Sequence, residues 1–326
     1  MKISFNKYED AVKYIHDSEK IDYETSFALS KFCAFLLRND EHLGRDIVIR
    51  IQDSWSKLCD KTYDIWNDLT ESAGLYPYVE PGTLSESALL RYEYHKSPFL
   101  NDVYLHAEQL SISLDLQSNK SVVVSAPTSF GKSLLIEEII SSRLYKNLVI
   151  IQPTLALLDE TRKKLFKYKD EYKIIVSTSQ EPSSTLGNIF LFTAERVVEY
   201  NSFPKIDFFV IDEFYKLSIE RDDDRAIALN QAFDKLLKQT SKFYLLGPMI
   251  KGIPLNFKEK FELSWFPSNF ATVAVDESNV EIHGKPKEKK ILKKQRLFEL
   301  LESSNEPTLI YCSSPNKATQ LAFEYT

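Results

Sequence analysis

One stretch of the sequence combines a hydrophobic run with residues that can hold phosphate. Ser121–Ser125 is rich in β-branched residues, and Gly131, Lys132 and Ser133 open an apolar helical pattern a few residues later. These three residues fit the pattern G-x-x-x-x-G-K-[ST], with Ala126 in place of the first glycine. Such a loop cradles phosphates because N–H groups at a helix N-terminus are unpaired and the helix dipole favours anions. The predicted nucleotide-binding loop comprises Ala126, Pro127, Thr128, Ser129, Phe130, Gly131, Lys132 and Ser133.

A second hydrophobic run ends in two adjacent carboxylates, Asp212 and Glu213. In a doubly wound sheet the carboxyl ends of parallel strands lie along one edge, so these carboxylates would lie near Lys132. Asp212 and Ser133 would then hold Mg²⁺, partly through water, while Lys132 contacts the β/γ-phosphates and Glu213 deprotonates the attacking water. Either motif alone also fits a chance loop or an exposed acidic turn. Their coincidence favours an ATP-hydrolysing site with Lys132, Asp212 and Glu213 as its catalytic residues.

The residues around these motifs alternate between strand-length apolar runs and helical patterns. The predicted strands are Val122–Ser125, Leu148–Gln152, Lys173–Ser177, Ile189–Thr193, Phe208–Asp212 and Phe243–Gly247, and the predicted helices are Ser133–Leu144, Leu155–Tyr168, Ala194–Tyr200 and Arg225–Lys238. This alternation is typical of a parallel sheet with helices on both faces. We therefore expect an α/β fold with a doubly wound parallel sheet.

The two ends of the sequence differ from this middle part. Apolar residues of the first 80 positions repeat at helical spacing, and the capping-box sequence Thr83–Glu86 restarts a helix after a Pro/Gly break. We expect an all-helical domain at residues 1–96, an α/β domain at 97–268, and a linker with the incomplete beginning of a second lobe at 269–326. In that last part, strand-like runs fall at Thr272–Val275, Val280–Ile282 and Thr308–Cys312, and a Lys-rich helix is expected from about Lys287 to Ser303.

Composition limits the function further. The net charge is −6, and residues 1–96 alone hold 12 basic against 17 acidic side chains, so any nucleic-acid surface must be local. The three cysteines are far apart, which argues against a disulfide framework or a zinc site. No apolar run approaches the ~20 residues that span a bilayer, and the first residues do not begin a signal peptide. We expect a cytoplasmic protein with no membrane contact.

At this point the sequence resembles superfamily 2 helicases of the DEAD/DEAH-box (DExH-like) group over about residues 97–326. APTSFGKS and DEFY look like that family's motifs I and II, where alanine at the first position of motif I is usual. The resemblance implies a RecA-like (P-loop NTPase) fold, ATP and Mg²⁺ as cofactors, and adenine recognition by Gln109. Taken alone, Gln109 could equally be a surface helix residue. The two boxes also look similar to helicases of bacterial phage-defence operons, such as the Hachiman type.

The resemblance also implies contacts to the backbone of one nucleic-acid strand. QPTLAL, beginning at Gln152, resembles motif Ia, and Thr193–Arg196 resembles motif Ib. The predicted nucleic-acid contacts are Pro153, Thr154, Arg162, Thr193 and Arg196. The chain departs from the family at Tyr215, the fourth residue of motif II, and at Leu246–Pro248, where motif III normally carries hydroxyls. The family's motifs V and VI lie in a second lobe that this sequence barely enters.

Two functions from different classes remain open. The first is the N-terminal portion of an ATP-dependent helicase or translocase that moves on or remodels DNA or RNA. The second is a nucleic-acid-sensing ATPase switch that holds and releases a protein partner, such as a defence effector, through residues 1–96. A non-motor ATPase is a third reading, and stimulation of ATP hydrolysis by DNA or RNA would separate it from the other two.

Overall fold

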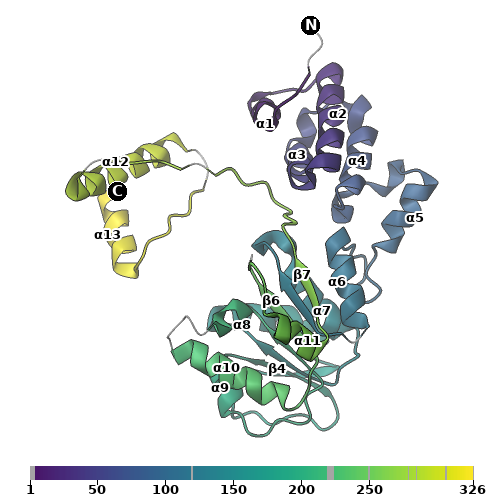
Figure 1. Ribbon diagram of the computed structural model, residues 1–326, viewed down its shortest axis with the longest axis vertical. Helices are drawn as coiled ribbons and strands as arrows, with labels where there is room; N and C mark the ends of the chain where they lie inside the picture. The colour runs from purple at the N-terminus through teal and green to yellow at the C-terminus, as the bar shows by residue number, and fades with distance from the viewer. Residues whose placement is uncertain are drawn as a thin grey trace. The chain divides into compact units, whose positions relative to one another are not determined.

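The computed structural model describes residues 4–118, 120–218, 224–248, 250–277, 279–283, 285–304 and 307–325. The chain divides into a compact unit, Met1–Ala274, and a second unit, Val275–Thr326. The first unit contains a helical region followed by a parallel sheet (Figure 1). The sheet carries the predicted motifs, and the helical region packs against the elements that support it.

The helical region confirms the expected all-helical N-terminus. Its α-helices are α1 (Tyr8–Asp17), α2 (Tyr23–Asn39), α3 (Glu41–Asp53), α4 (Tyr63–Ser72) and α5 (Glu86–Tyr94), joined by short 3₁₀ turns. Side chains of Asp22 and Asp40 accept hydrogen bonds from Thr25 N and Leu43 N, which satisfies free N–H groups at the starts of α2 and α3. The fully buried Trp66 of α4 donates its indole N–H to Ser26 Oγ at 2.9 Å, linking α4 to α2.

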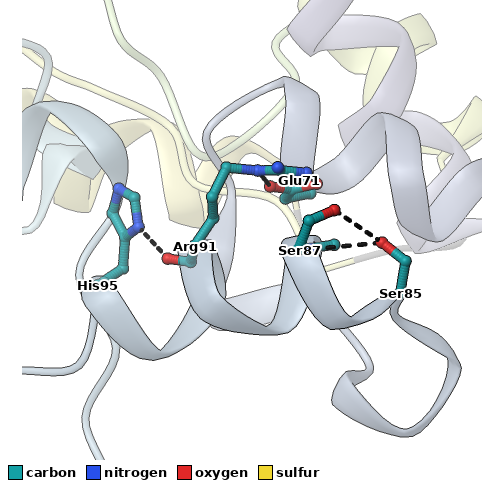
Figure 2. Close-up of polar contacts among 6 residues, drawn as sticks. Glu71, Ser85, Ser87, Arg91 and His95 are labelled. Carbon is teal, nitrogen blue, oxygen red and sulfur yellow. Dashed lines mark hydrogen bonds and ion pairs between the residues drawn. The ribbon is translucent and has the colours of Figure 1, made fainter.

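Helix α5 is fixed to α4 by a charged contact. Ser85 is its N-cap and accepts a hydrogen bond from Ala88 N at 3.3 Å. Arg91 forms an ion pair with the buried carboxylate of Glu71 on α4, and one of its two bonds measures 3.0 Å (Figure 2). The ring Nδ1 of His95 donates to the carbonyl oxygen of Arg91 at 2.8 Å. A buried carboxylate needs such a partner, so Glu71 positions α5.

The sheet has seven strands in the order β3-β4-β2-β5-β6-β1-β7, and all neighbours are parallel. The strands are β1 (Val122–Ser125), β2 (Asn147–Ile151), β3 (Tyr172–Ile175), β4 (Gly187–Phe192), β5 (Phe208–Ile211), β6 (Phe243–Gly247) and β7 (Ser264–Pro267). The six predicted strands and the α/β fold class are confirmed, and β7 is an addition. The register pairs Ser125 with Gly247 and Ile211 with both Ile151 and Leu245, so these strands end within about two residues of one another.

Helices cover both faces of the sheet. Strand residues of one face form a core with α6 (Ala107–Gln117), α7 (Lys132–Ser141) and α8 (Leu155–Leu165), which continues into the core of the helical region. The opposite face packs against α9 (Ala194–Glu199), α10 (Asp224–Leu237) and α11 (Leu255–Phe261). Burial on both sides explains why β1, β2 and β5 read as continuous apolar runs.

The second unit differs from expectation. It contains α12 (Pro286–Ser303), which confirms the Lys-rich helix, and α13 (Pro315–Tyr325). The strands predicted at Thr308–Cys312 and Val280–Ile282 are not formed, and neither is one at Thr272–Val275 beside the unit boundary. An extended segment becomes a strand only when a neighbour pairs its backbone groups. None of the described strands pairs with residues 308–312, where Leu309 is 98% exposed.

Candidate active site at the carboxyl edge of the sheet

A cavity of about 490 Å³ lies where β1, β5 and β6 end. The residues that line it come from the loop after β1, the turn after β5, the end of β6 and helix α8. Its lining residues include Thr128, Gly131, Lys132, Ser133, Gln152, Asp212, Glu213, Tyr215, Leu246, Gly247 and Pro248. The structure therefore brings the two predicted motifs together, and it places the Leu246–Pro248 segment beside them.

The loop before α7 depends on Gly131. Its φ of +77° lies in the left-handed region, and an added Cβ would stand 2.6 Å from Nε2 of Gln109. That amide donates to the carbonyl oxygen of Phe130 at 2.7 Å, and its Oε1 accepts from His106 N at 2.9 Å. Gln109 is only 2% exposed, so its reading as a surface helix residue is wrong. Its amide supports the loop through the bond to Phe130, and Gln109 is not among the residues that line the cavity.

Lys132 is held inside its own loop. Its Nζ donates to the carbonyl oxygens of Ala126 at 2.9 Å and Pro127 at 2.7 Å. Burial lowers the pKa of Lys132, while the negative charge of Asp212 raises it. Carbonyl oxygens are weaker partners for an ammonium group than charged phosphate oxygens. The lysine is therefore placed to transfer its hydrogen bonds to an anion that enters the cavity.

The two carboxylates after β5 have different surroundings. Burial raises the pKa of Asp212, the neighbouring charge of Glu213 raises it further, and Lys132 lowers it. Glu213 adopts a φ of +58°, a left-handed conformation that costs a residue with a side chain about 1–3 kcal/mol. Its N–H donates to Oδ1 of Asp212 at 3.0 Å, and its carboxylate forms an ion pair with Lys216. The strained turn thus aims Asp212 and Glu213 into one cavity.

The chain after β7 supports the loop from the other side. Thr272 donates its hydroxyl to the carbonyl oxygen of Ser129 at 2.7 Å. The buried ring of Phe270 meets Phe130 edge-on, with 6.2 Å between ring centroids. The guanidinium of Arg45 lies over the same ring, 3.9 Å from its centroid. This series of contacts connects α3 of the helical region to the predicted phosphate loop.

A second cavity, of about 250 Å³, lies beside the first, with Gln152 and Asp212 lining both. Its lining residues are Ile151, Gln152, Pro153, Thr193, Ala194, Glu195, Asp212, Lys216, Arg225, Ala226 and Leu229. Of the predicted nucleic-acid contacts, the structure places Pro153 and Thr193 here. The side chain of Thr154 caps α8.

The two predicted arginines make contacts of their own. On α8, Arg162 forms an ion pair with Asp159 at 2.8 Å. On α9, Arg196 donates to the carbonyl oxygen of Val176 at 2.7 Å. Neither lines the second cavity. Lys216 and Arg225 are cations that do line it, and neither was among the predicted contacts. The sequence signal that could have identified Lys216 is its position three residues after Glu213, next to the predicted acidic motif.

Comparisons with known proteins agree with this architecture. Residues 1–89 match the family described as Anti-bacteriophage protein B N-terminal domain, and residues 107–246 match the family described as DEAD/DEAH box helicase. The chain is 34% identical to "Anti-bacteriophage protein B" of Escherichia coli (strain K12) over an alignment of 328 residues. This alignment covers 97% of the chain. The chain spans 44% of the length of that relative. Within the described residues, no helix has the length and apolar character needed to cross a bilayer.

Proposed function

This chain carries an anti-bacteriophage protein B N-terminal domain followed by a DEAD/DEAH box helicase domain, and we propose that it is the N-terminal, ATP-hydrolysing portion of a helicase or translocase. The main support for this proposal is that one cavity is lined by Lys132, Ser133, Asp212 and Glu213. A cation, a hydroxyl and two carboxylates are the groups that nucleoside triphosphate hydrolysis needs. The match of residues 107–246 to the DEAD/DEAH box helicase family confirms the predicted resemblance at the level of the domain.

The residues of the cavity fit ATP and Mg²⁺. The N-terminal N–H groups of α7 and the ammonium of Lys132 would hold the phosphates. Ser133 and Asp212 would bind Mg²⁺, which characteristically takes one or two protein ligands and completes its shell with water and phosphate oxygens. Bound Mg²⁺ would neutralise charge that develops on the phosphates. Glu213 would orient the attacking water and accept its proton.

The second cavity supports binding of a nucleic-acid backbone. Pro153 and Thr193 line it together with the cations Lys216 and Arg225. Cations and hydroxyls of this kind hold strand phosphates without reading bases, which suits a protein that acts on DNA or RNA of any sequence. We propose that the strand passes over this cavity, beside the nucleotide site.

A second candidate function is a nucleic-acid-sensing switch that retains a protein partner through residues 1–96. The match of residues 1–89 to a domain of an anti-bacteriophage protein favours it, as does the acidic character of this region. The similarity to Anti-bacteriophage protein B of Escherichia coli further supports a role in defence against phage. Both functions use the same ATP site and can coexist in one protein.

The ATP site can be tested by calorimetry. Lys132→Ala should abolish ATP binding or nearly so, because the main positive charge facing the phosphates is lost. Lys238→Ala is the matched control, since Lys238 forms an exposed ion pair with Asp234 and lines neither cavity. Wild-type ATP affinity in Lys132→Ala would disprove the assignment. Fluorescence anisotropy with single-stranded DNA and RNA then tests the strand-binding part separately.

A further inference from the structure

The ion pair between Lys216 and Glu213 joins the two cavities. Glu213 lines the nucleotide cavity and Lys216 lines the second cavity, and the short 3₁₀ turn Phe214–Leu217 places them one turn apart. Both side chains are about one-third exposed, at 34% for Glu213 and 32% for Lys216. While this pair holds, the carboxylate proposed as the base and the ammonium that lines the strand cavity neutralise each other.

The second cavity has the chemistry of a phosphodiester site. Lys216 and Arg225 supply positive charge, and Thr193 supplies a hydroxyl donor. The side chain of Gln152 also lines it, and the Oε1 atom of this buried residue has no hydrogen-bond partner among the described residues. Buried polar atoms are normally paired, so an unpartnered amide suits a group that completes its contacts when a ligand arrives. The carboxylates that also line the cavity are the exposed Glu195 and the half-buried Asp212 of the nucleotide site.

Resting on the proposed function, we propose that Lys216 is a strand-phosphate contact that exchanges its partner. Without a strand it is bound to Glu213, and a backbone phosphate entering the second cavity takes the ammonium in place of that carboxylate. The exchange costs little because a partly exposed ion pair contributes little net stability, whereas an ammonium bonds strongly to phosphate. Strand binding would thereby release Glu213 to hold the attacking water, which couples the two sites through one side chain.

The lack of the usual hydroxyls at Leu246–Pro248 gives this contact added importance. In the family that the sequence resembles, a Ser-Ala-Thr segment stands at this place, and here Leu246, Gly247 and Pro248 line the nucleotide cavity without a side-chain donor. The carbonyl oxygen of Pro248 is bound by the hydroxyl of Ser125 at 2.9 Å, so the segment is anchored to β1. Among the described residues, the Glu213–Lys216 pair is a direct side-chain link between the residues lining the two cavities.

A double-mutant cycle on strand binding tests the exchange without requiring ATP turnover. Affinity for a single-stranded oligonucleotide is measured by anisotropy, over a range of salt concentrations, in the wild type and in Lys216→Gln, Glu213→Gln and the double variant. Lys216→Gln should weaken binding and reduce the salt slope by about one unit, because one phosphate contact is lost. Glu213→Gln should tighten binding about threefold by freeing the ammonium. The double variant should bind like Lys216→Gln alone.

The exposed pair of Asp234 and Lys238, whose charged atoms lie 2.7 Å apart, provides a matched control cycle. The residues that follow contact the amino end of β5: Gln239 accepts a hydrogen bond from Ile206 N, and Thr240 donates one to the carbonyl oxygen of Asp207. This edge of the sheet is opposite to both cavities. Asp234→Asn and Lys238→Gln change the charge by the same amounts, and neither should alter strand affinity by more than the general electrostatic effect.

The outcomes separate the exchange from the proposed function. Tighter binding in Glu213→Gln that disappears in the double variant supports the exchange, and a merely structural role of the ion pair would weaken binding in both single variants. Strand binding that Glu213→Gln leaves unchanged overturns the exchange but leaves the proposed function standing. A chain that binds ATP in calorimetry but binds no strand in any form overturns the exchange together with the nucleic-acid part of the proposed function.

Discussion

Gln109 illustrates how a residue predicted for one role can act through another. The resemblance to DEAD/DEAH-box helicases implies that it reads adenine. In the structure both ends of its amide are engaged within the chain, with His106 N and the Phe130 carbonyl oxygen as partners. A buried amide with both ends bonded fixes the position of the groups that it joins. The geometry therefore indicates that Gln109 sets the conformation of the predicted phosphate loop.

This role predicts a specific pattern of nucleotide affinity. Gln109→Ala should destabilise the protein by about 1–3 kcal/mol, because the loop carbonyl loses a buried partner. Affinities for ATP and GTP should fall by the same factor, since the loop is proposed to contact the phosphates, which both nucleotides share. Thermal melts and calorimetry with each nucleotide provide the measurement. A loss confined to ATP would instead establish adenine recognition by this side chain.

At the scale of elements, the sequence predicted the strands that are buried on both faces. β1, β2 and β5 are continuous apolar runs. Asp212 could be placed because it directly follows β5, and Lys132 because it opens a helix a few residues after β1. β7 was missed because Ser264–Pro267 is short and mixed, and only its pairing with β1 makes it a strand. Proline at the end of an edge strand is tolerated because its missing N–H is not needed there. The predicted strand at Thr308–Cys312 failed for the converse reason, because pairing is a tertiary property.

The segment after β7 has a function that its sequence did not indicate. Thr272 binds the carbonyl oxygen of Ser129, and Phe270 packs against Phe130, so this segment and Gln109 support the loop from two sides. A loop with two supports needs less reordering when it binds phosphate, and such preorganisation increases affinity.

Thr272→Val should therefore weaken ATP binding without touching the nucleotide. Loss of one hydrogen bond of about 1 kcal/mol corresponds to an approximately fivefold higher Kd. Thr240→Val is the matched control, because the Thr240 hydroxyl donates to the carbonyl oxygen of Asp207 at 3.0 Å on the opposite edge of the sheet. Calorimetry should find ATP affinity reduced in Thr272→Val only, while both variants lose similar thermal stability. Equal ATP affinities in the two variants would show that the segment does not support the loop.

At the scale of the whole molecule, the helical region and the sheet share one continuous core. A single cluster of buried residues includes Ile47 and Trp66 of the helical region together with Ile112, Val122 and Leu148 from α6 and the sheet. Arg45, only 3% exposed, donates its Nε–H to the carbonyl oxygen of Ala73 and covers the ring of Phe270. Such a core makes the first unit, through Ala274, the smallest piece that we expect to fold cooperatively.

A fragment of residues 1–274 should therefore unfold in one transition, within about 2 °C of the longer chain, and bind ATP equally well. Every described residue that lines the nucleotide cavity belongs to it. The comparison fragment, residues 97–274, keeps the cavity residues but loses Arg45 and the apolar partners of α6. Because exposed apolar surface and an uncovered Phe270 ring would remain, it should melt earlier and bind ATP more weakly. Calorimetry and thermal melts of both fragments decide the matter: if residues 97–274 match the longer chain in stability and affinity, the helical region is a separate domain that does not support the loop.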